Sequence, residues 1–223
     1  MITVHHLNNS RSQRVLWLLE ELGLDYEIRR YERDPATMLA PPSLKAVHPL
    51  GKAPVITDGD QVIAESGAIM EYLVEYYGRG RLIPPGGTSD RLRYTYWLHY
   101  AEGSAMTPLL LKLIFDRMPN LSKPSVLRPL VRRIANTVKA RFVEPQIAMH
   151  VIYLEAELGR HTWFAGAEFT AADIQMSFPV EAIATRVGLD TAKPRLLAYL
   201  ERIHARPAYL RAVERGGPYA LMR

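Results

Sequence analysis

The first third of the chain alternates short β-like runs with stretches of helical periodicity. Residues 2–7 read as a strand, and apolar residues within 15–22 recur at helical spacing until Gly23, which is typical of a helix end. Alternation over 26–31 predicts a second strand, whereas the prolines within 35–42 predict irregular backbone. Strands and helices that alternate in this way indicate an α/β layer.

A hairpin and a final helix complete this part of the chain. Runs 54–57 and 61–64 are both β-like and flank a strong turn sequence at 58–60, so we expect them to pair antiparallel. Ser66 is a candidate N-cap for the helix that follows, and Gly78 ends it. The predicted element order is therefore βαβαββα.

Beyond residue 90 the pattern is helical. The Gly- and Pro-rich stretch 79–90 is predicted to be a linker, and after it apolar residues recur every three or four positions. We therefore predict an α/β domain over 1–78 followed by an all-α bundle over 91–223. Inside the bundle, Thr170 and Asp173 form a capping-box sequence, so we expect Asp173 to be structural rather than catalytic.

Composition narrows the classes of function. The chain contains no cysteine, which excludes disulfides, thiolate metal sites and cysteine nucleophiles, so any reactive thiol must come from a ligand. No apolar run approaches the roughly 18 residues of a membrane span, and the N-terminus lacks the pattern of a signal peptide. We therefore expect a cytoplasmic protein without a membrane anchor, and the scattered histidines indicate no metal site.

Charge is unevenly distributed along the chain. Residues 1–90 carry 9 basic and 12 acidic side chains, and residues 91–223 carry 19 and 11, for a net charge of +5. The stretch 123–141 has six basic residues and no acidic one, but aromatic residues are not interleaved with them. We interpret this run as a solvated face or a subunit contact and expect no nucleic-acid partner.

The polar loop 8–12 is the first candidate for chemistry. It joins a strand to a helix at the edge of the sheet where open α/β folds bind ligands. Its hydroxyls and amides are donors beside the positive end of the helix, a combination that suits an anion and specifically a thiolate. These donors belong to Asn8, Asn9, Ser10 and Ser12. The alternative is that Ser10 or Ser12 merely caps the helix.

Two further elements suit an amino-acid-like ligand. A cis bond before Pro54 would turn the preceding backbone outward to pair with an extended peptide-like ligand, with Lys52 placed to meet a carboxylate. Glu65 directly precedes the Ser66 N-cap, so the helix start suits a carboxylate while Glu65 suits an ammonium group. Together they predict a site for a zwitterionic amino-acid end.

Taken in order, these motifs closely resemble those of the cytosolic glutathione transferases, over the whole chain. The resemblance rests on residues 10–23, 48–55, 65–69 and 169–173. It favours the bacterial and fungal branch with serine-type loops, because no tyrosine precedes Tyr26 and cysteine is absent. It implies a thioredoxin-like N-terminal domain, an α-helical C-terminal domain, a homodimer and glutathione as co-substrate.

The resemblance also implies roles for residues around the ligand. Pro54 matches the cis-proline, and Ala53 matches the residue whose backbone pairs with the cysteinyl part of glutathione. Lys52 matches a position near the glycyl carboxylate. Glu65 and Ser66 match the pair that binds the γ-glutamyl end.

For the thiol, the resemblance implies Ser10 as the activating hydroxyl, with Asn8, Asn9 and Ser12 as alternatives in the same loop. Lowering a thiol pKa of about 8.5 by two units requires about 2.7 kcal/mol of thiolate stabilisation. A hydrogen bond to a charged group supplies roughly 1.5 to 3 kcal/mol and the helix end roughly 0.3 to 1 kcal/mol. These contributions suffice without a general base.

The implied reaction is attack of the glutathione thiolate on a hydrophobic electrophile, or reduction of a hydroperoxide. We expect the electrophile site between the domains, lined by the first helix after the linker and the end of the chain. Its candidates are Tyr100, Met106, Leu110, Phe115 and Tyr219. Two alternatives stay open: a non-catalytic interaction module with this fold, and a glutathione-dependent isomerase of a small dicarboxylic ketone, which needs cations such as Arg11 near the thiol.

Overall fold

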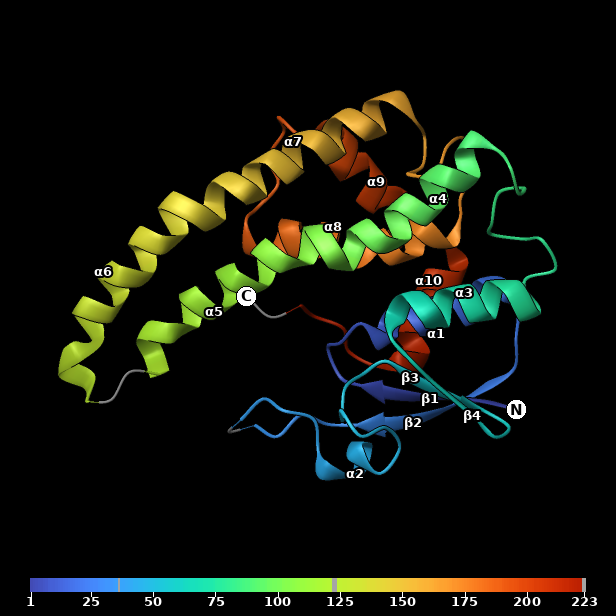
Figure 1. Ribbon diagram of the computed structural model, residues 1–223, viewed down its shortest axis with the longest axis horizontal. Coiled ribbons are helices and arrows are strands. Elements are labelled where there is room, and N and C mark those ends of the chain that lie inside the picture. The colour runs from blue at the N-terminus through green and yellow to red at the C-terminus, as the bar shows by residue number, and fades with distance from the viewer. Residues whose placement is uncertain (36, 122–123, 222–223) are drawn as a thin grey trace.

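The computed structural model of the chain describes residues 1–35, 37–121 and 124–221 (Figure 1). Its N-terminal part has the predicted order βαβαββα. The elements are β1 (Ile2–Leu7), α1 (Ser12–Leu22), β2 (Tyr26–Tyr31), α2 (Pro42–Lys45), β3 (Val55–Asp58), β4 (Gln61–Ala64) and α3 (Ser66–Tyr77). The thioredoxin-like fold predicted for this part, including the β3–β4 hairpin, is confirmed.

The four strands form one mixed sheet in the order β2-β1-β3-β4. β1 pairs parallel with β2, across the α1 crossover, and antiparallel with β3. The register places the buried Val4 beside Ile28 and Ile56. Helices α1 and α3 lie between the sheet and the helical domain, whereas α2 lies on the other side (Figure 1).

The remainder of the described chain is helical, as predicted. The elements are α4 (Ser89–Tyr100), a π-helical turn (Ala101–Ala105), α5 (Met106–Leu121), a 3₁₀ turn (Ser125–Leu127), α6 (Arg128–Val138), a second π-helical turn (Lys139–Val143), α7 (Glu144–Arg160), α8 (Ala171–Arg186), α9 (Pro194–His204) and α10 (Pro207–Gly216). Residues 79–88 connect α3 to α4 without helix or strand. Residue 123, where the basic run begins, and residues 222–223 of the predicted bundle lie outside the described residues.

Two long rods run across Figure 1, one made of α4 and α5 and the other of α6 and α7. Their left-hand ends, α5 and α6, form an arm. Each rod contains a π-helical turn where its two helices meet. In the first turn the N–H of Met106 bonds to the carbonyl of Ala101, one residue further back than in an α-helix. The faces of α4 and α5 are therefore offset by one residue from regular helical spacing.

Helix α8 runs through the core of the helical domain and begins at the predicted capping box. The Asp173 carboxylate accepts the Thr170 N–H at 2.9 Å and the Phe164 N–H at 2.8 Å. Burial raises the pKa of Asp173 to about 6, although these hydrogen bonds act in the opposite direction. Asp173 thus binds backbone groups at the start of the helix, in the structural role that the capping motif predicts.

Helix α1 is covered on both sides. One face packs on β1, as the apolar spacing predicts, and Gly23 ends the helix with φ of +65°. The other side is covered by α8 and α10 of the helical domain, so the polar side chains of Gln13 and Arg14 are buried as well. A buried guanidinium needs partners inside the protein, and those of Arg14 lie at the functional site.

The described residues form neither a membrane span nor a cluster of metal ligands. None of the helices within 1–35, 37–121 and 124–221 is long and apolar enough to cross a bilayer. In the same ranges, no group of three or more His, Asp or Glu side chains is arranged to hold a metal ion.

Candidate functional site

Ser10 lies in the loop between β1 and α1, and a chain of hydrogen bonds holds its hydroxyl. Ser10 Oγ lies 2.7 Å from Ser12 Oγ and accepts the Ser12 N–H at 3.2 Å. Ser12 Oγ lies in turn 2.8 Å from His6 Nδ1. Ser12 is 0% exposed, whereas Ser10 lines a cavity. The structure therefore presents Ser10 to a ligand and places Ser12 behind it.

His6 sets the direction of these hydrogen bonds. Burial and the charge of Arg30 lower the pKa of His6 to about 4, so the ring is neutral at neutral pH. A hydrogen bond to the backbone of Gly216 acts in the opposite direction, as expected where a ring N–H donates to a carbonyl. A proton on Nε2 leaves Nδ1 to accept from Ser12 Oγ, which lies 2.8 Å away. In that arrangement the Ser10 hydroxyl donates to Ser12 Oγ.

The two asparagines of the loop have different surroundings. Asn8 Oδ1 accepts the Arg33 N–H at 3.1 Å, and Asn8 is not among the described residues that line the cavity. Asn9 lines it with φ of +49°, and its Oδ1 accepts the Ala220 N–H at 2.8 Å. Asn9 thus ties the C-terminal segment to the site.

A second cavity, of about 240 Å³, lies between the loop before β3 and the start of α3. The Ala53–Pro54 peptide is cis, as the resemblance implies, and both residues line this cavity together with Lys52. Glu65 and Ser66 also line it. Glu65 is exposed, has φ of +71° and is the N-cap of α3, so the prediction of Ser66 as the N-cap is wrong by one residue. Ser66 is buried as the first residue of the helix. The fold therefore brings these five predicted residues together.

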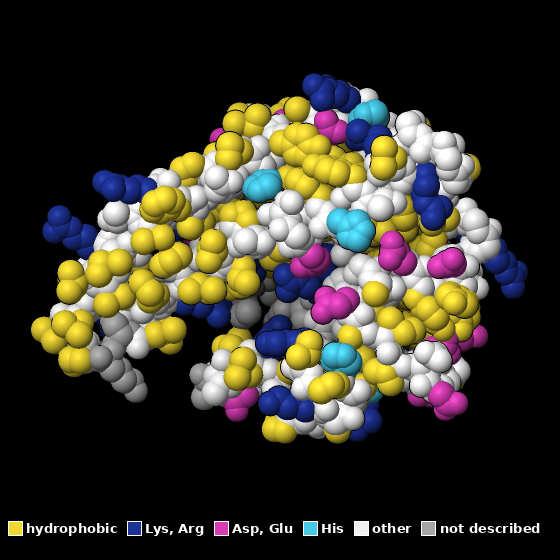
Figure 2. All heavy atoms as spheres, in the orientation of Figure 1, with side chains coloured by type: hydrophobic (Ala, Val, Ile, Leu, Met, Phe, Trp, Pro, Cys, Tyr) yellow, Lys and Arg dark blue, Asp and Glu magenta, His cyan; other side chains and the backbone are white. Residues whose placement is uncertain are grey.

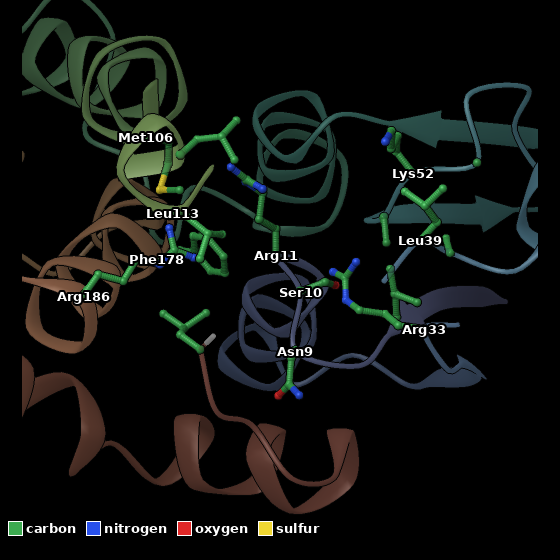
Figure 3. A pocket seen from close by; sticks show the side chains of 16 residues that line it. Asn9, Ser10, Arg11, Arg33, Leu39, Lys52, Met106, Leu113, Phe178 and Arg186 are labelled. Atoms are coloured by element: carbon green, nitrogen blue, oxygen red, sulfur yellow. The ribbon is translucent and has the colours of Figure 1, made fainter. Parts of the chain in front are cut away.

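The two cavities adjoin. The one that Ser10 lines has a volume of about 290 Å³ and shares Arg11, Lys52 and Ala53 with the other. Its opposite wall comes from α5 and α8 of the helical domain (Figure 3). Figure 2 shows this region as a hollow with basic side chains in it, between the helical arm and the N-terminal domain. An extended ligand that starts at Glu65 therefore reaches Ser10 at the junction.

A buried arginine connects the second cavity, lined by Glu65 and Ser66 and called the polar cavity below, to the helical domain. Arg14 is 1% exposed. Its guanidinium donates to Ser66 Oγ at 3.0 Å, to Glu102 Oε1 at 2.5 Å and to the Gln175 carbonyl at 2.6 Å. Glu102 lies in the first π-helical turn and also accepts from Arg11 Nε at 2.9 Å. Because these partners come from both domains, they fix the two walls of the site relative to each other.

Glu102 is ionised in this arrangement. Burial alone would raise its pKa, but the charges and hydrogen bonds of Arg14 and Arg11 hold the pKa below its usual value. Its carboxylate lines the polar cavity and compensates the charge of Arg11 beside Ser10. The sequence gives no sign of this role, because the partners are about 90 residues apart.

The candidate electrophile residues of α5 separate onto two faces. Met106 and Leu110 line the cavity that contains Ser10, together with Leu113 on the same helical face. Phe115 follows Met106 by nine residues, about two and a half helical turns, and so lies on the opposite side of α5. It packs against the core and is absent from the described lining.

The structure also places Tyr100 and Tyr219 outside this lining. Tyr100 precedes the π-helical turn, and its hydroxyl lies 2.5 Å from His150 Nδ1, facing α7. Tyr219 donates to Glu181 Oε2 at 2.8 Å, and it is Leu221 that lines the cavity from the end of the described chain. Six residues of a regular α-helix turn through about 600°, so Tyr100 and Met106 lie on different faces of this rod even without the π-helical turn.

The lining residues that the sequence analysis did not assign to the site include Arg33, Phe178 and Arg186. Arg33 follows the end of β2, and Arg186 is the last residue of α8. Basic residues at such positions are common, so no local signal marks them. Phe178 lies within the buried α8, where its ring is 4.9 Å from the Arg11 guanidinium carbon and 5.1 Å from that of Arg14.

Known proteins share both parts of this architecture. Residues 1–75 match the family described as glutathione S-transferase, N-terminal domain, and residues 126–207 match glutathione S-transferase, C-terminal domain. Glutathione S-transferase 3 of Schizosaccharomyces pombe is 37% identical over 182 residues, which cover 82% of this chain and 74% of that protein. The crystal structure of an Actinobacillus pleuropneumoniae glutathione S-transferase has a TM-score of 0.78 and 35% identity, covering 97% of this chain and 93% of that one. A sphingomonad glutathione S-transferase solved with glutathione shares the fold, with a TM-score of 0.73 and 24% identity over 96% of this chain and 98% of that one.

Replacement of Arg14 tests whether the buried guanidinium holds the site together. Arg14→Met leaves Glu102 and Ser66 without this donor, so we expect the free energy of unfolding at pH 7 to fall by about 3 kcal/mol. Because the pKa of Glu102 is lowered in the folded protein, the pair contributes fully above the usual carboxyl pKa and is lost as the pH falls through the folded value. The loss of unfolding free energy caused by Arg14→Met should therefore shrink below about pH 4.

Urea unfolding at several pH values measures this loss. The control is Arg211→Met, which removes a surface ion pair to Glu20 and should lower the free energy of unfolding by less than about 1 kcal/mol. Equal costs for both variants at pH 7 would refute this role.

Two variants of Glu65 distinguish its effect on ligand binding from its effect on the stability of the fold. Positive φ strains a residue with a side chain by about 1 to 3 kcal/mol, and glycine relieves that strain at an entropic cost of roughly 0.5 to 1 kcal/mol. Glu65→Gly should therefore stabilise the fold by about 1 kcal/mol and weaken glutathione binding about tenfold, since it removes the ammonium partner. Glu65→Gln keeps the side chain's size and should weaken binding without stabilising the fold. Thermal unfolding and calorimetry measure both effects, and full glutathione affinity in both variants would contradict the assignment.

Proposed function

The chain belongs to the glutathione S-transferase family, and from that premise we propose that it binds glutathione in the polar cavity, ionises its thiol at Ser10 and transfers it to an electrophile held by the helical domain. The observation that most supports this proposal is the position of Ser10. Its hydroxyl lines a cavity with helical residues on one side, and that cavity adjoins the one lined by Glu65 and Ser66. The sphingomonad protein of the same fold, solved with glutathione, supports the choice of ligand.

In this proposal each part of glutathione has a partner. Glu65 takes the ammonium group of the γ-glutamyl end, and Ser66 at the start of α3 takes its carboxylate. The backbone of Ala53 pairs with the cysteinyl part, which brings the sulfur to Ser10. Lys52, which lines both cavities, takes the glycyl carboxylate.

Ionisation of the thiol comes from the hydroxyl and from the helix behind it. The thiol releases its proton to solvent water. The Ser10 O–H then turns from Ser12 Oγ and donates a hydrogen bond to the thiolate sulfur, while the Ser12 N–H continues to donate to Ser10 Oγ. Helix α1 begins at Ser12 and directs its positive end to the same place. Their sum matches the roughly 2.7 kcal/mol that a two-unit fall in the thiol pKa requires.

The thiolate then attacks the electrophile. A sulfur–carbon bond forms as the leaving group departs with its electron pair, and Met106 and Leu110 supply apolar contacts to the electrophile. With a hydroperoxide, the thiolate attacks the outer oxygen, an alcohol leaves, and a second glutathione reduces the oxidised sulfur to give glutathione disulfide and water. The chain has both a site for an amino-acid end, at Glu65 and Ser66, and a hydroxyl for the thiol, at Ser10. This combination supports an enzyme over a non-catalytic interaction module.

Ser10→Ala tests the ionisation step. Loss of the hydroxyl should raise the pKa of bound glutathione by about one to two units, because a hydrogen bond to the thiolate contributes roughly 1.5 to 3 kcal/mol. Calorimetry should show little change in affinity, while the ultraviolet thiolate band near neutral pH should largely disappear. Asn9→Ala is the matched variant, because Asn9 lines the same cavity. A band that survives Ser10→Ala and is lost in Asn9→Ala would assign the sulfur to Asn9. Failure of the unaltered protein to bind glutathione would favour the interaction module.

We also propose that the protein is a homodimer. Figure 2 shows hydrophobic side chains gathered over the arm that α5 and α6 form, and contiguous exposed apolar surface of this kind is typical of interaction sites. Exposed members include Leu111, Ile114, Leu121, Val126, Leu130, Ile134 and Phe142. Light scattering at micromolar concentration should give twice the 25.3 kDa of one chain. A mass of one chain under these conditions would refute the proposal.

A further inference from the structure

Arg33 lies at the cavity of Ser10 because of the way in which β1 and β2 pair. The two strands are parallel, so their carboxyl ends meet at one edge of the sheet. Backbone pairing continues past the strands, where the Asn8 N–H donates to the Tyr31 carbonyl at 3.1 Å. The Asn8 side chain then accepts the Arg33 N–H, also at 3.1 Å. The loop that carries Ser10 therefore also holds the backbone of Arg33 in place.

The guanidinium of Arg33 has unused hydrogen-bonding capacity at this cavity. Its side chain extends toward Ser10 (Figure 3), and both residues line the cavity. Nη1 donates to the Met38 carbonyl at 3.1 Å. Within the described part of the chain, Nε is buried without a hydrogen-bond partner, and Nη2 has none either.

The charge of Arg33 is likewise uncompensated. No acidic side chain of the described residues forms an ion pair with Arg33, and none of the described residues that line this cavity is acidic. Burial and the positive charges of Arg11 and Arg117 lower the pKa of Arg33. A desolvated cation in such surroundings costs free energy unless an anion joins it. We therefore expect an anionic group of the ligand to meet this guanidinium.

The other charges around the site already have partners or face elsewhere. Glu102 compensates Arg11 at 2.9 Å, and Lys52 is assigned to the glycyl carboxylate of glutathione. The acidic residues next to Arg33 in the sequence, Glu32 and Asp34, line the adjoining cavity on the α2 side. The anion that remains for Arg33 is the thiolate.

We propose that Arg33 is a second catalytic residue, which donates a charge-assisted hydrogen bond to the thiolate of bound glutathione alongside Ser10. This inference rests on the proposed function, since it adds a residue to the same thiol site. The guanidinium keeps its protons throughout, and the thiol proton goes to water. Arg33 stabilises the negative charge that remains on the sulfur until the sulfur attacks the electrophile.

The thiol pKa of bound glutathione tests this role. Arg33→Gln should raise that pKa by about one unit, because an opposite charge within about 4 to 6 Å lowers a pKa by roughly one unit or more. Arg33→Lys keeps the charge and should restore part of the shift. Titration of the ultraviolet thiolate band measures the pKa. The matched control is Arg29→Gln, an exposed cation of β2 outside the described lining of both cavities, which should leave the thiol pKa unchanged.

The pH dependence of conjugation should show the same shift. With saturating glutathione and chlorodinitrobenzene, the sulfur bonds to the ring carbon and chloride leaves with the electron pair of the carbon–chlorine bond. For Arg33→Gln, kcat/KM should fall about tenfold near pH 6 and approach that of the unaltered protein near pH 9, where the thiol is ionised in both. An equal fall at both pH values would indicate a merely structural role and overturn the inference.

S-Methylglutathione distinguishes the thiolate from the glycyl carboxylate as the partner of Arg33. It keeps the carboxylate but has no thiol to ionise. Calorimetry should show that Arg33→Gln changes its affinity by less than about twofold. Binding weakened by about tenfold, with the thiol pKa of bound glutathione unchanged, would assign Arg33 to the carboxylate and overturn the inference.

The unaltered protein separates this failure from failure of the proposed function. If it binds glutathione with a thiolate band near neutral pH, and Arg33→Gln keeps the same thiol pKa, the role of Arg33 is refuted and glutathione transfer stands. If the unaltered protein binds no glutathione, both proposals fail.

Discussion

One buried guanidinium determines how the two domains meet. Arg14 is enclosed by its own helix, by the start of α3 and by two segments of the helical domain, and its Nη1 and Nη2 groups make the hydrogen bonds described above only if all of them are in place. Burying such a charge is unfavourable unless its partners are correctly arranged. The contacts therefore select one orientation of the domains among the many that hydrophobic packing alone would permit. Ser66 is one of these partners, so the same contacts also shape the polar cavity.

The two domains contribute different chemistry to the cleft. The N-terminal domain supplies hydroxyls, backbone groups and a helix start, which are small and rigidly held by the sheet. The helical domain supplies long side chains from α5 and α8, which define the shape and charge of the opposite wall. In the function we propose, recognition of the constant co-substrate and of a variable second substrate is divided between these two structural layers. Under that proposal, changes in α5 or α8 should alter the second substrate without disturbing thiol ionisation.

Local sequence signals predicted most of the fold. The hairpin around 58–60, the helix end at Gly23 and the capping box at Asp173 each depend on residues close together in the chain, and each is present. The polar cavity was predictable for the same reason, because short motifs carry its residues. In contrast, Arg14, Glu102 and Arg186 meet their partners only through tertiary packing. No periodicity marks such contacts.

Misplaced expectations on the helical side have a geometric origin. Tyr100 and Met106 lie six residues apart on one long rod, and that separation alone places their side chains on different faces. Phe115 was assigned to the cavity although it is half a turn away from Met106 around α5. In long helices of this kind, the sequence predicts burial better than it predicts which neighbour a residue contacts.

The first π-helical turn has a consequence for comparing chains of this family. Such a turn contains one residue more than an α-helix needs for the same path, so a relative without it should align with a single-residue gap between 100 and 106. In that relative the helices on either side would keep their facing, but the turn that carries Glu102 toward Arg11 and Arg14 would be an ordinary α-helical one. Insertion of a single residue into a long helix can thus create a contact between domains while the packing of the flanking helices stays in place.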